Sequence, residues 1–317
     1  MTGTPAAGDR LATLAAWLAR GGWPVAAVLA LLVALSLLVA LLPAGILLLP
    51  LLLIGNVAAV SLLVLEGDTA RSGRCLVRAL LLLVLPVLAL GPAMLVPVVF
   101  AWLPALTAGY VLRATRSLPL ALLLLTLLAV VVVVVAEAAG LPGGEAQSRV
   151  ALAQMMQSLD PPLAADVLDA MLAVASGLLA LALLSAWVGG LLFGRSLQAR
   201  LHRPGALAAE FRALRCGRAY GVLALLVCAA AMGLGLRHGA VAVELALVLL
   251  MPLLLQGLAV MHRLALRGGG WRRAPWLVYP LLVLATPQVA PPLALLGLMD
   301  NWFDFKNGSS PTGADPR

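Results

Sequence analysis

The chain has 317 residues, of which 63% are hydrophobic and 11% charged, and its formal net charge is +8. A soluble domain is about 45–50% apolar and about 25% charged, so no water-soluble fold would bury this much apolar side chain. Continuous apolar runs, without the in/out alternation of barrel strands, predict an all-α integral membrane protein. The basic residues lie in short gaps between these runs, which argues against a nucleic-acid partner and favours contact with anionic lipids.

Residues 1–21 are expected to form a cytoplasmic N-terminus with a short interfacial helix, because apolar side chains recur there at helical spacing. The apolar run that follows has no convincing cleavage site, so we expect a retained helix and not a signal peptide. Residues 22–136 are expected to hold five transmembrane helices, centred on Trp23–Leu42, Ala44–Leu65, Val77–Leu90, Ala93–Leu112 and Leu118–Ala136.

The second half of the chain is expected to add four more helices. An external acidic loop, 137–169, leads to the sixth helix, 170–194, and an Arg-rich cytoplasmic loop, 195–218, follows it. Residues 219–299 hold helices seven to nine, and 300–317 form a polar tail. The last four centres are Leu168–Leu191, Tyr220–Leu236, Ala240–Leu264 and Pro275–Leu298. The fold class is therefore a bundle of about nine transmembrane helices, with eight to ten possible.

The positive-inside rule gives this bundle an orientation. With the N-terminus in the cytoplasm, the Arg clusters at 71–78, 113–116, 195–218 and 263–273 all face the cytoplasm. The last apolar segment is interrupted by several prolines, so it is one kinked crossing or a broken, partly re-entrant segment. A single crossing, which we favour, places the tail outside.

Two loops are long enough for a further role. The external loop is a plain connection or a lid on the outer surface. The cytoplasmic loop contains a predicted helix, Ala206–Cys216, with Leu207, Phe211 and Leu214 on one face. That face is expected to lie on the membrane surface or against a partner.

Charged residues inside the hydrocarbon are functional candidates because they are expensive to place there. Glu244 lies within the predicted eighth helix, and a rotation of 100° per residue puts Arg237 and His262 on the same face. A substrate-contacting or coupling carboxylate is one interpretation. A Glu that snorkels outward or pairs with Arg237 is the other.

Asn56 and Gln256 fall in the middle of predicted helices, where an amide needs a partner. They are expected to hydrogen-bond between helices or to line a small polar cavity. Small residues at four-residue spacing permit close helix packing, in the two sets Ala26/Ala30/Ala34 and Ala186/Gly190/Gly194.

Motifs for catalysis are missing from the sequence. No Gly-rich phosphate loop, HExxH, CxxC or GxSxG pattern occurs, so we expect no catalytic residues, no metal site and no cofactor. The three cysteines have no metal or redox spacing and are expected to be free thiols.

The end of the last apolar segment, Leu293–Lys306, carries a Gly-x-x-Asp-x-Trp-x-Asp-Phe pattern at Gly297, Asp300, Trp302, Asp304 and Phe305. Together with Gly194–Arg218 and Leu253–Ala265, it resembles the YybS-like family of bacterial membrane proteins, with Lys306 where that family has Arg. The resemblance implies a place in the bacterial inner membrane. It also implies a distant similarity to the substrate-binding subunits of energy-coupling-factor transporters, which bind a solute near the outer face and contact a membrane partner through small residues.

Three hypotheses for function follow. The first is a non-enzymatic protein that binds or helps to move a solute or lipid, with Glu244, Asn56 and Gln256 as its intramembrane polar contacts. The second is a membrane scaffold or assembly factor, and the third is an intramembrane lipid-modifying enzyme. The residues expected to contact a partner protein subunit are Leu207, Phe211, Leu214, Asp300, Trp302 and Asp304.

Overall fold

The computed structural model describes residues 10–40, 42, 45, 48–139 and 165–303. The described residues form helices and contain no strand, which confirms the all-α prediction. Within them, eight helices are long and apolar enough to cross a membrane, as expected for a multi-pass membrane protein. The chain divides into two compact units, unit 1 (Met1–Glu210) and unit 2 (Phe211–Arg317).

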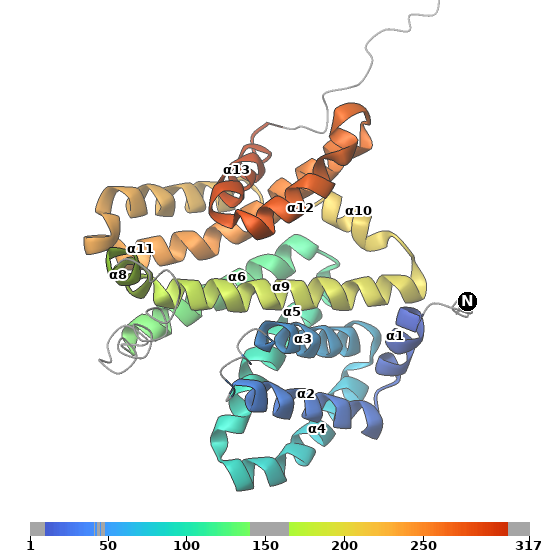
Figure 1. Ribbon diagram of the computed structural model, residues 1–317. Helices are drawn as coiled ribbons and strands as arrows, with labels where there is room; N and C mark the ends of the chain where they lie inside the picture. Colours follow the sequence, from blue (N-terminus) through green and yellow to red (C-terminus); the bar gives the residue numbers. More distant parts are fainter. Residues whose placement is uncertain (1–9, 41, 43–44, 46–47, 140–164, 304–317) are drawn as a thin grey trace, which may run out of the picture. The chain divides into compact units, whose positions relative to one another are not determined.

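Unit 1 holds the first six of these long helices, together with shorter segments (Figure 1). The bounds are α1 Arg10–Arg20, α2 Trp23–Ala40, α3 Leu49–Glu66, α4 Thr69–Leu90, η2 Pro92–Leu95, α5 Val96–Thr115, α6 Leu118–Ala138, α8 Ala165–Ala173 and α9 Ala175–His202. The helix α1 occupies the stretch where an interfacial helix was expected. Most of the external loop, residues 140–164, lies outside the described part.

Two helix ends in unit 1 were predicted in the wrong place. The third transmembrane helix begins at Thr69, not near Val77, because the Asp68 side chain accepts a hydrogen bond from the backbone N–H of Ala70 and caps α4. The sixth continues into the predicted loop as far as His202, because Pro204 and Gly205 are the first helix breakers after it.

Small residues on α9 pack against α3, as their spacing predicted. A Cβ atom at Gly190 would lie 2.5 Å from the Cβ of Val57, and one at Gly194 would lie 2.8 Å from the carbonyl oxygen of Ala58. Ala186 is buried on the same face. Only residues without a side chain permit α3 and α9 to approach this closely.

The other small-residue set lies on α2. Ala26 and Ala30 are buried and Ala34 is half-buried, and α2 packs against α3 and α4. Two of these three alanines therefore already serve packing inside unit 1.

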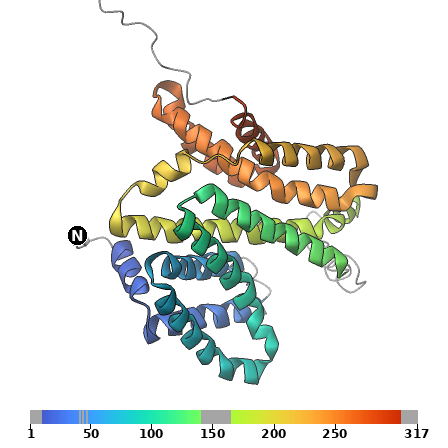
Figure 2. The ribbon, with the colours of Figure 1, turned by 180° about the vertical axis from the view of Figure 1, so that it is seen from behind.

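Unit 2 is built around one long helical element that folds back on itself. Its elements are α11 Arg218–Leu266, η3 Gly269–Arg273, α12 Ala274–Leu284 and α13 Thr286–Met299. The backbone of α11 is non-helical at Gly235, with φ of 62°, and at Gly239; a positive φ strongly favours glycine. The two arms lie side by side (Figures 1 and 2), and the hydroxyl of Tyr220 on the first donates to the carbonyl of Leu249 on the second over 2.6 Å. These arms are the predicted seventh and eighth helices.

The predicted ninth helix is two short helices, α12 and α13, which meet at Ala285. The hydroxyl of Tyr279 on α12 lies 3.5 Å from His262 Nε2 on α11. A Cβ atom at Gly257 of α11 would overlap the carbonyl group of Leu293 on α13, so these two helices cross in close contact there.

The end of α13 lies beside Gln256 of α11, whose side chain donates to Asp300 over 3.2 Å. Asp300 lies 2.6 Å from Arg263, which is one turn before the end of that helix. Tyr279 of α12 lies beside His262, Leu293 of α13 beside Gly257 and Gly297 beside Leu253, so the segment runs along α11 from its C-terminal end towards the middle of the second arm.

The amphipathic helix predicted at Ala206–Cys216 is shorter, and α10 spans Ala206–Arg212. Residues after it form an irregular turn into α11 that includes Gly217, with φ of 90°. This turn carries Leu214 into the core of unit 2, where it is fully buried. Leu214 therefore does not share an exposed face with Leu207, which is half-exposed on α10.

Candidate functional site

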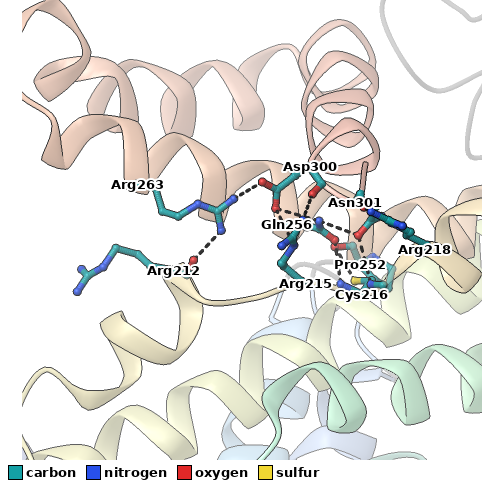
Figure 3. A network of polar contacts seen from close by, with 10 residues as sticks. Arg212, Arg215, Cys216, Arg218, Pro252, Gln256, Arg263, Asp300 and Asn301 are labelled. Atoms are coloured by element: carbon teal, nitrogen blue, oxygen red, sulfur yellow. Dashed lines mark hydrogen bonds and ion pairs between the residues drawn. The ribbon is translucent and has the colours of Figure 1, made fainter. Parts of the chain in front are cut away.

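A cluster of polar contacts in the described part of unit 2 surrounds Asp300, directly after α13 (Figure 3). The carboxylate of Asp300 is 1% exposed and accepts a hydrogen bond from Arg263 Nη2 over 2.6 Å. Arg215 lies on its other side, with its Nε 3.8 Å from Oδ2 and an Nη donating to the Asp300 backbone carbonyl. Two guanidinium groups therefore neutralise one buried carboxylate.

Gln256, on the second arm of α11, completes this cluster and is fully buried. Its Nε2 donates to Asp300 Oδ2 over 3.2 Å and to Asn301 Oδ1 over 3.1 Å, and its Oε1 accepts from the backbone N–H of Cys216 over 2.9 Å. The amide thus joins three separate parts of unit 2, and its partners lie in the turn before α11 and directly after α13.

Backbone groups add to the same cluster. The N–H of Gly217 donates to Asn301 Oδ1 over 3.2 Å, and Arg218 Nε donates to the Asn301 carbonyl over 3.3 Å. Burial raises the pKa of the Cys216 thiol to about 12, so this thiol stays protonated at neutral pH. We call Arg215, Cys216, Gln256, Arg263, Asp300 and Asn301 the Asp300 cluster.

The contacts of the Asp300 cluster form a structural connection between α13 and α11. The Asp300 carboxylate is shared among two arginines and an amide. Trp302 follows it with 41% of its surface exposed, and its ring lies against α11, where a Cβ atom at Gly221 would be 2.9 Å from the ring. These contacts hold the end of α13 against both arms of α11.

The residues predicted to contact a partner differ in their burial. Asp300 and Leu214 are buried inside unit 2, because the first is paired with arginines and the second lies in the turn before α11. The ring of Phe211 makes an edge contact with that of His262 at a centroid distance of 5.7 Å. Trp302 remains partly exposed, and Asp304 lies outside the described residues.

The predicted polar stripe on α11 is not a shared site. Glu244 is 1% exposed, whereas the Nδ1–H of His262 donates to the Leu258 carbonyl over 2.9 Å. The two residues are 18 positions apart on one helical arm, which corresponds to about 27 Å. The side chain of Arg237 lies outside the described part. Among the described residues, no three His, Cys, Asp or Glu side chains cluster closely enough to hold a metal ion.

Asn56 stands beside a pocket of unit 1. Its Nδ2 donates to the carbonyl of Leu52 over 3.2 Å and lies 3.5 Å from the hydroxyl of Ser36 on α2. Its Oδ1 lies 3.5 Å from the indole nitrogen of Trp102 on α5. Contacts of 3.5 Å are at the limit of a hydrogen bond, so this buried amide is only weakly satisfied by other helices.

The pocket itself has a volume of about 330 Å³. Four helices line it, and apart from Ser36 and Asn56 its lining is apolar, including Leu53 on α3, Phe100 on α5 and Leu179 on α9. We call it the Asn56 pocket. An apolar hollow with a polar group at one point suits an amphiphilic or largely apolar ligand.

Sequence reasoning found Asn56 and Gln256 but missed most of their partners. Trp102 and Ser36 carry no signal that separates them from ordinary residues of an apolar helix. Arg215 and Arg263 were assigned only to topology, because nothing in the sequence brings α13 back to them. No protein-family model, no curated protein and no solved structure matches this chain.

Proposed function

We propose that this chain is a non-enzymatic membrane protein whose unit 1 binds a small amphiphilic molecule or a lipid chain in the Asn56 pocket. The observation that carries the proposal is the pairing of an apolar hollow of about 330 Å³ with a buried amide whose two side-chain contacts are both 3.5 Å long. A ligand carbonyl or hydroxyl that reached Asn56 at normal distance would improve its hydrogen bonding. The chain would then serve as a binding or transport component.

The resemblance to the YybS-like family, and through it to transporter substrate-binding subunits, agrees with this role in a bacterial inner membrane. We propose further that the N-terminus is cytoplasmic, as the Arg clusters indicate. Eight crossings and a re-entrant pair, α12–α13, would then place both termini in the cytoplasm.

The test is to purify the whole protein and to look for a retained small molecule by native mass spectrometry. Leu179→Trp would fill the Asn56 pocket from α9, and Asn56→Leu would remove its amide; both should lower the occupancy of the retained molecule. Leu178→Trp is the matched control, because Leu178 is also exposed on α9, next in sequence, but does not line the pocket. A wild-type protein with no bound species in any lipid, or equal loss in both Trp variants, would refute the proposal.

A scaffold or assembly role is the second candidate, favoured by the exposed aromatic side chains of Trp302 and Phe303 at the end of α13. Crosslinking through a photoreactive group at position 302 distinguishes the two roles. Reproducible protein adducts together with an empty Asn56 pocket would favour the scaffold.

A further inference from the structure

A second pocket of unit 1, with a volume of about 420 Å³, lies where the C-terminal ends of α3, α5 and α9 meet. Its charged lining consists of Arg113, Arg116, Arg195, His202, Arg203 and Glu210. We call it the basic pocket. It is separate from the Asn56 pocket, because Leu65 in its wall is nine residues beyond Asn56 on α3, or about 14 Å away along the helix.

Some of the charged residues in this lining make contacts that support the fold. Arg113 donates to the carbonyl of Val64 over 3.2 Å and to that of Gly67, so it caps the end of α3. Arg195 is paired with Glu210, with Nε 3.1 Å from Oε2. His202 lies 2.7 Å from a carboxylate oxygen of Glu66.

The other two arginines of the lining make no contact of this kind with the described residues. Arg116 and Arg203 are exposed, and neither makes a hydrogen bond or ion pair through its side chain with any residue that the structure describes. The lining has four arginines against one glutamate, so with neutral His202 its formal charge is 4 − 1 = +3. Counting Glu66 as well still leaves a positive charge.

The backbone at Arg116 is a separate observation. Arg116 ends α5 in the left-handed conformation with φ of 54°, and no other described residue except glycine has a positive φ. Glycine or asparagine is the usual residue at such a helix end. Arginine here costs backbone energy, and an unfavourable conformation held next to a pocket points to a function.

The general preference of cytoplasmic loops for arginine does not account for this arrangement. That preference determines which side of the membrane the arginines face, and it does not require them to lie close together. Here arginines from two helix ends line one hollow, and guanidinium groups bind phosphate oxygens through paired hydrogen bonds. We propose that the basic pocket binds a phosphate-bearing anion, which is either the headgroup of an anionic lipid or a soluble phosphate.

The double variant Arg116→Gln/Arg203→Gln tests this site. Both side chains are exposed, so the variant should fold. The matched control is Arg272→Gln/Arg273→Gln, which removes the same charge from η3 in unit 2. Each protein is reconstituted in phosphatidylcholine nanodiscs, either with added phosphatidylglycerol or with inorganic phosphate in solution.

We expect the pocket variant to lose affinity by roughly thirtyfold, which corresponds to about 2 kcal/mol, while the control keeps the wild-type value. Loss of phosphatidylglycerol retained in native mass spectrometry would support the site with a lipid headgroup as its ligand. Loss of inorganic phosphate binding, followed by ³¹P NMR, would support it with a soluble phosphate. Equal losses in both double variants, or binding of neither probe by the wild type, would overturn the proposal.

Discussion

At the scale of single residues, Asp300 shows how a charge is kept inside an apolar protein. Its carboxylate is buried, and two arginines and one amide surround it. A buried ion pair adds little compared with an apolar replacement, but removal of one partner leaves an uncompensated charge. The Asp300 cluster therefore makes the attachment of α13 sensitive to single substitutions.

Asp300→Ala should destabilise unit 2 strongly. The side chain of Arg263 is only 15% exposed, so its charge would stay buried without a carboxylate, and breaking such a pair costs about 3–5 kcal/mol. We expect a clear fall in the denaturation temperature, measured by differential scanning fluorimetry in one detergent. Asp169→Ala, which changes an exposed carboxylate on α8, serves as the control. An unchanged denaturation temperature for Asp300→Ala would show that the cluster does not hold α13.

Cys216 gives a prediction that depends on pH. Its pKa is raised by burial from an ordinary value of 9.0 to about 12, so the folded protein holds this proton more tightly than the unfolded chain. Stability from this group is complete below pH 9 and falls as the pH rises from about 9 to about 12. Because only the thiolate reacts readily, alkylation of Cys216 by iodoacetamide at pH 9 should be slow in the folded protein and fast after denaturation. Peptide mass spectrometry measures both rates, and equal rates would contradict the burial of this thiol.

At the scale of helices, the contact of α9 with α3 depends on the absence of a side chain at Gly190. A methyl group there would lie 2.5 Å from Val57, whereas one at the neighbouring Gly189 would lie at an ordinary 3.6 Å from Ile54. The sequence spacing predicted which glycine faces the partner helix. It did not identify α3 as that partner.

Gly190→Ala and Gly189→Ala should therefore change stability in opposite directions. Forcing a methyl group into the α3–α9 contact costs about 1–3 kcal/mol, while alanine in place of glycine within a helix contributes about 0.5–1 kcal/mol when space is available. The comparison of the two denaturation temperatures in the same detergent measures both effects. A Gly190→Ala protein as stable as Gly189→Ala would mean that the two helices separate easily.

The helices themselves were predictable, because a long apolar run can satisfy its backbone only as a helix in lipid. The ends of the helices were harder to predict. For example, α4 begins directly after its capping residue Asp68, several residues before the start that hydropathy indicated. The Asp300 cluster could not be predicted, because Arg215, Gln256 and Asp300 are far apart in sequence. Only the packing of α13 against α11 brings them together.

At the scale of the whole molecule, α12 and α13 determine on which side of the membrane the C-terminal tail lies. These helices have 11 and 14 residues, or about 16 and 21 Å, and each is shorter than a hydrocarbon core of about 30 Å. Two such helices end to end would be long enough to cross. The carboxylate of Asp300 pairs with Arg263 and Arg215, both from Arg clusters that the positive-inside rule assigns to the cytoplasm, which favours a re-entrant pair.

A reporter fused after Arg317 tests this topology. We expect green fluorescent protein to fluoresce there and alkaline phosphatase to be inactive, because a re-entrant α12–α13 pair returns the tail to the cytoplasmic side of the Arg clusters. The control fusion follows Gly239, between the arms of α11, where the same topology requires the opposite result. Active phosphatase after Arg317 would mean that α12 and α13 cross the membrane as one broken helix. The Asp300 cluster would then have to lie away from the Arg-rich side, and the pairing of Asp300 with Arg263 could not survive in the membrane.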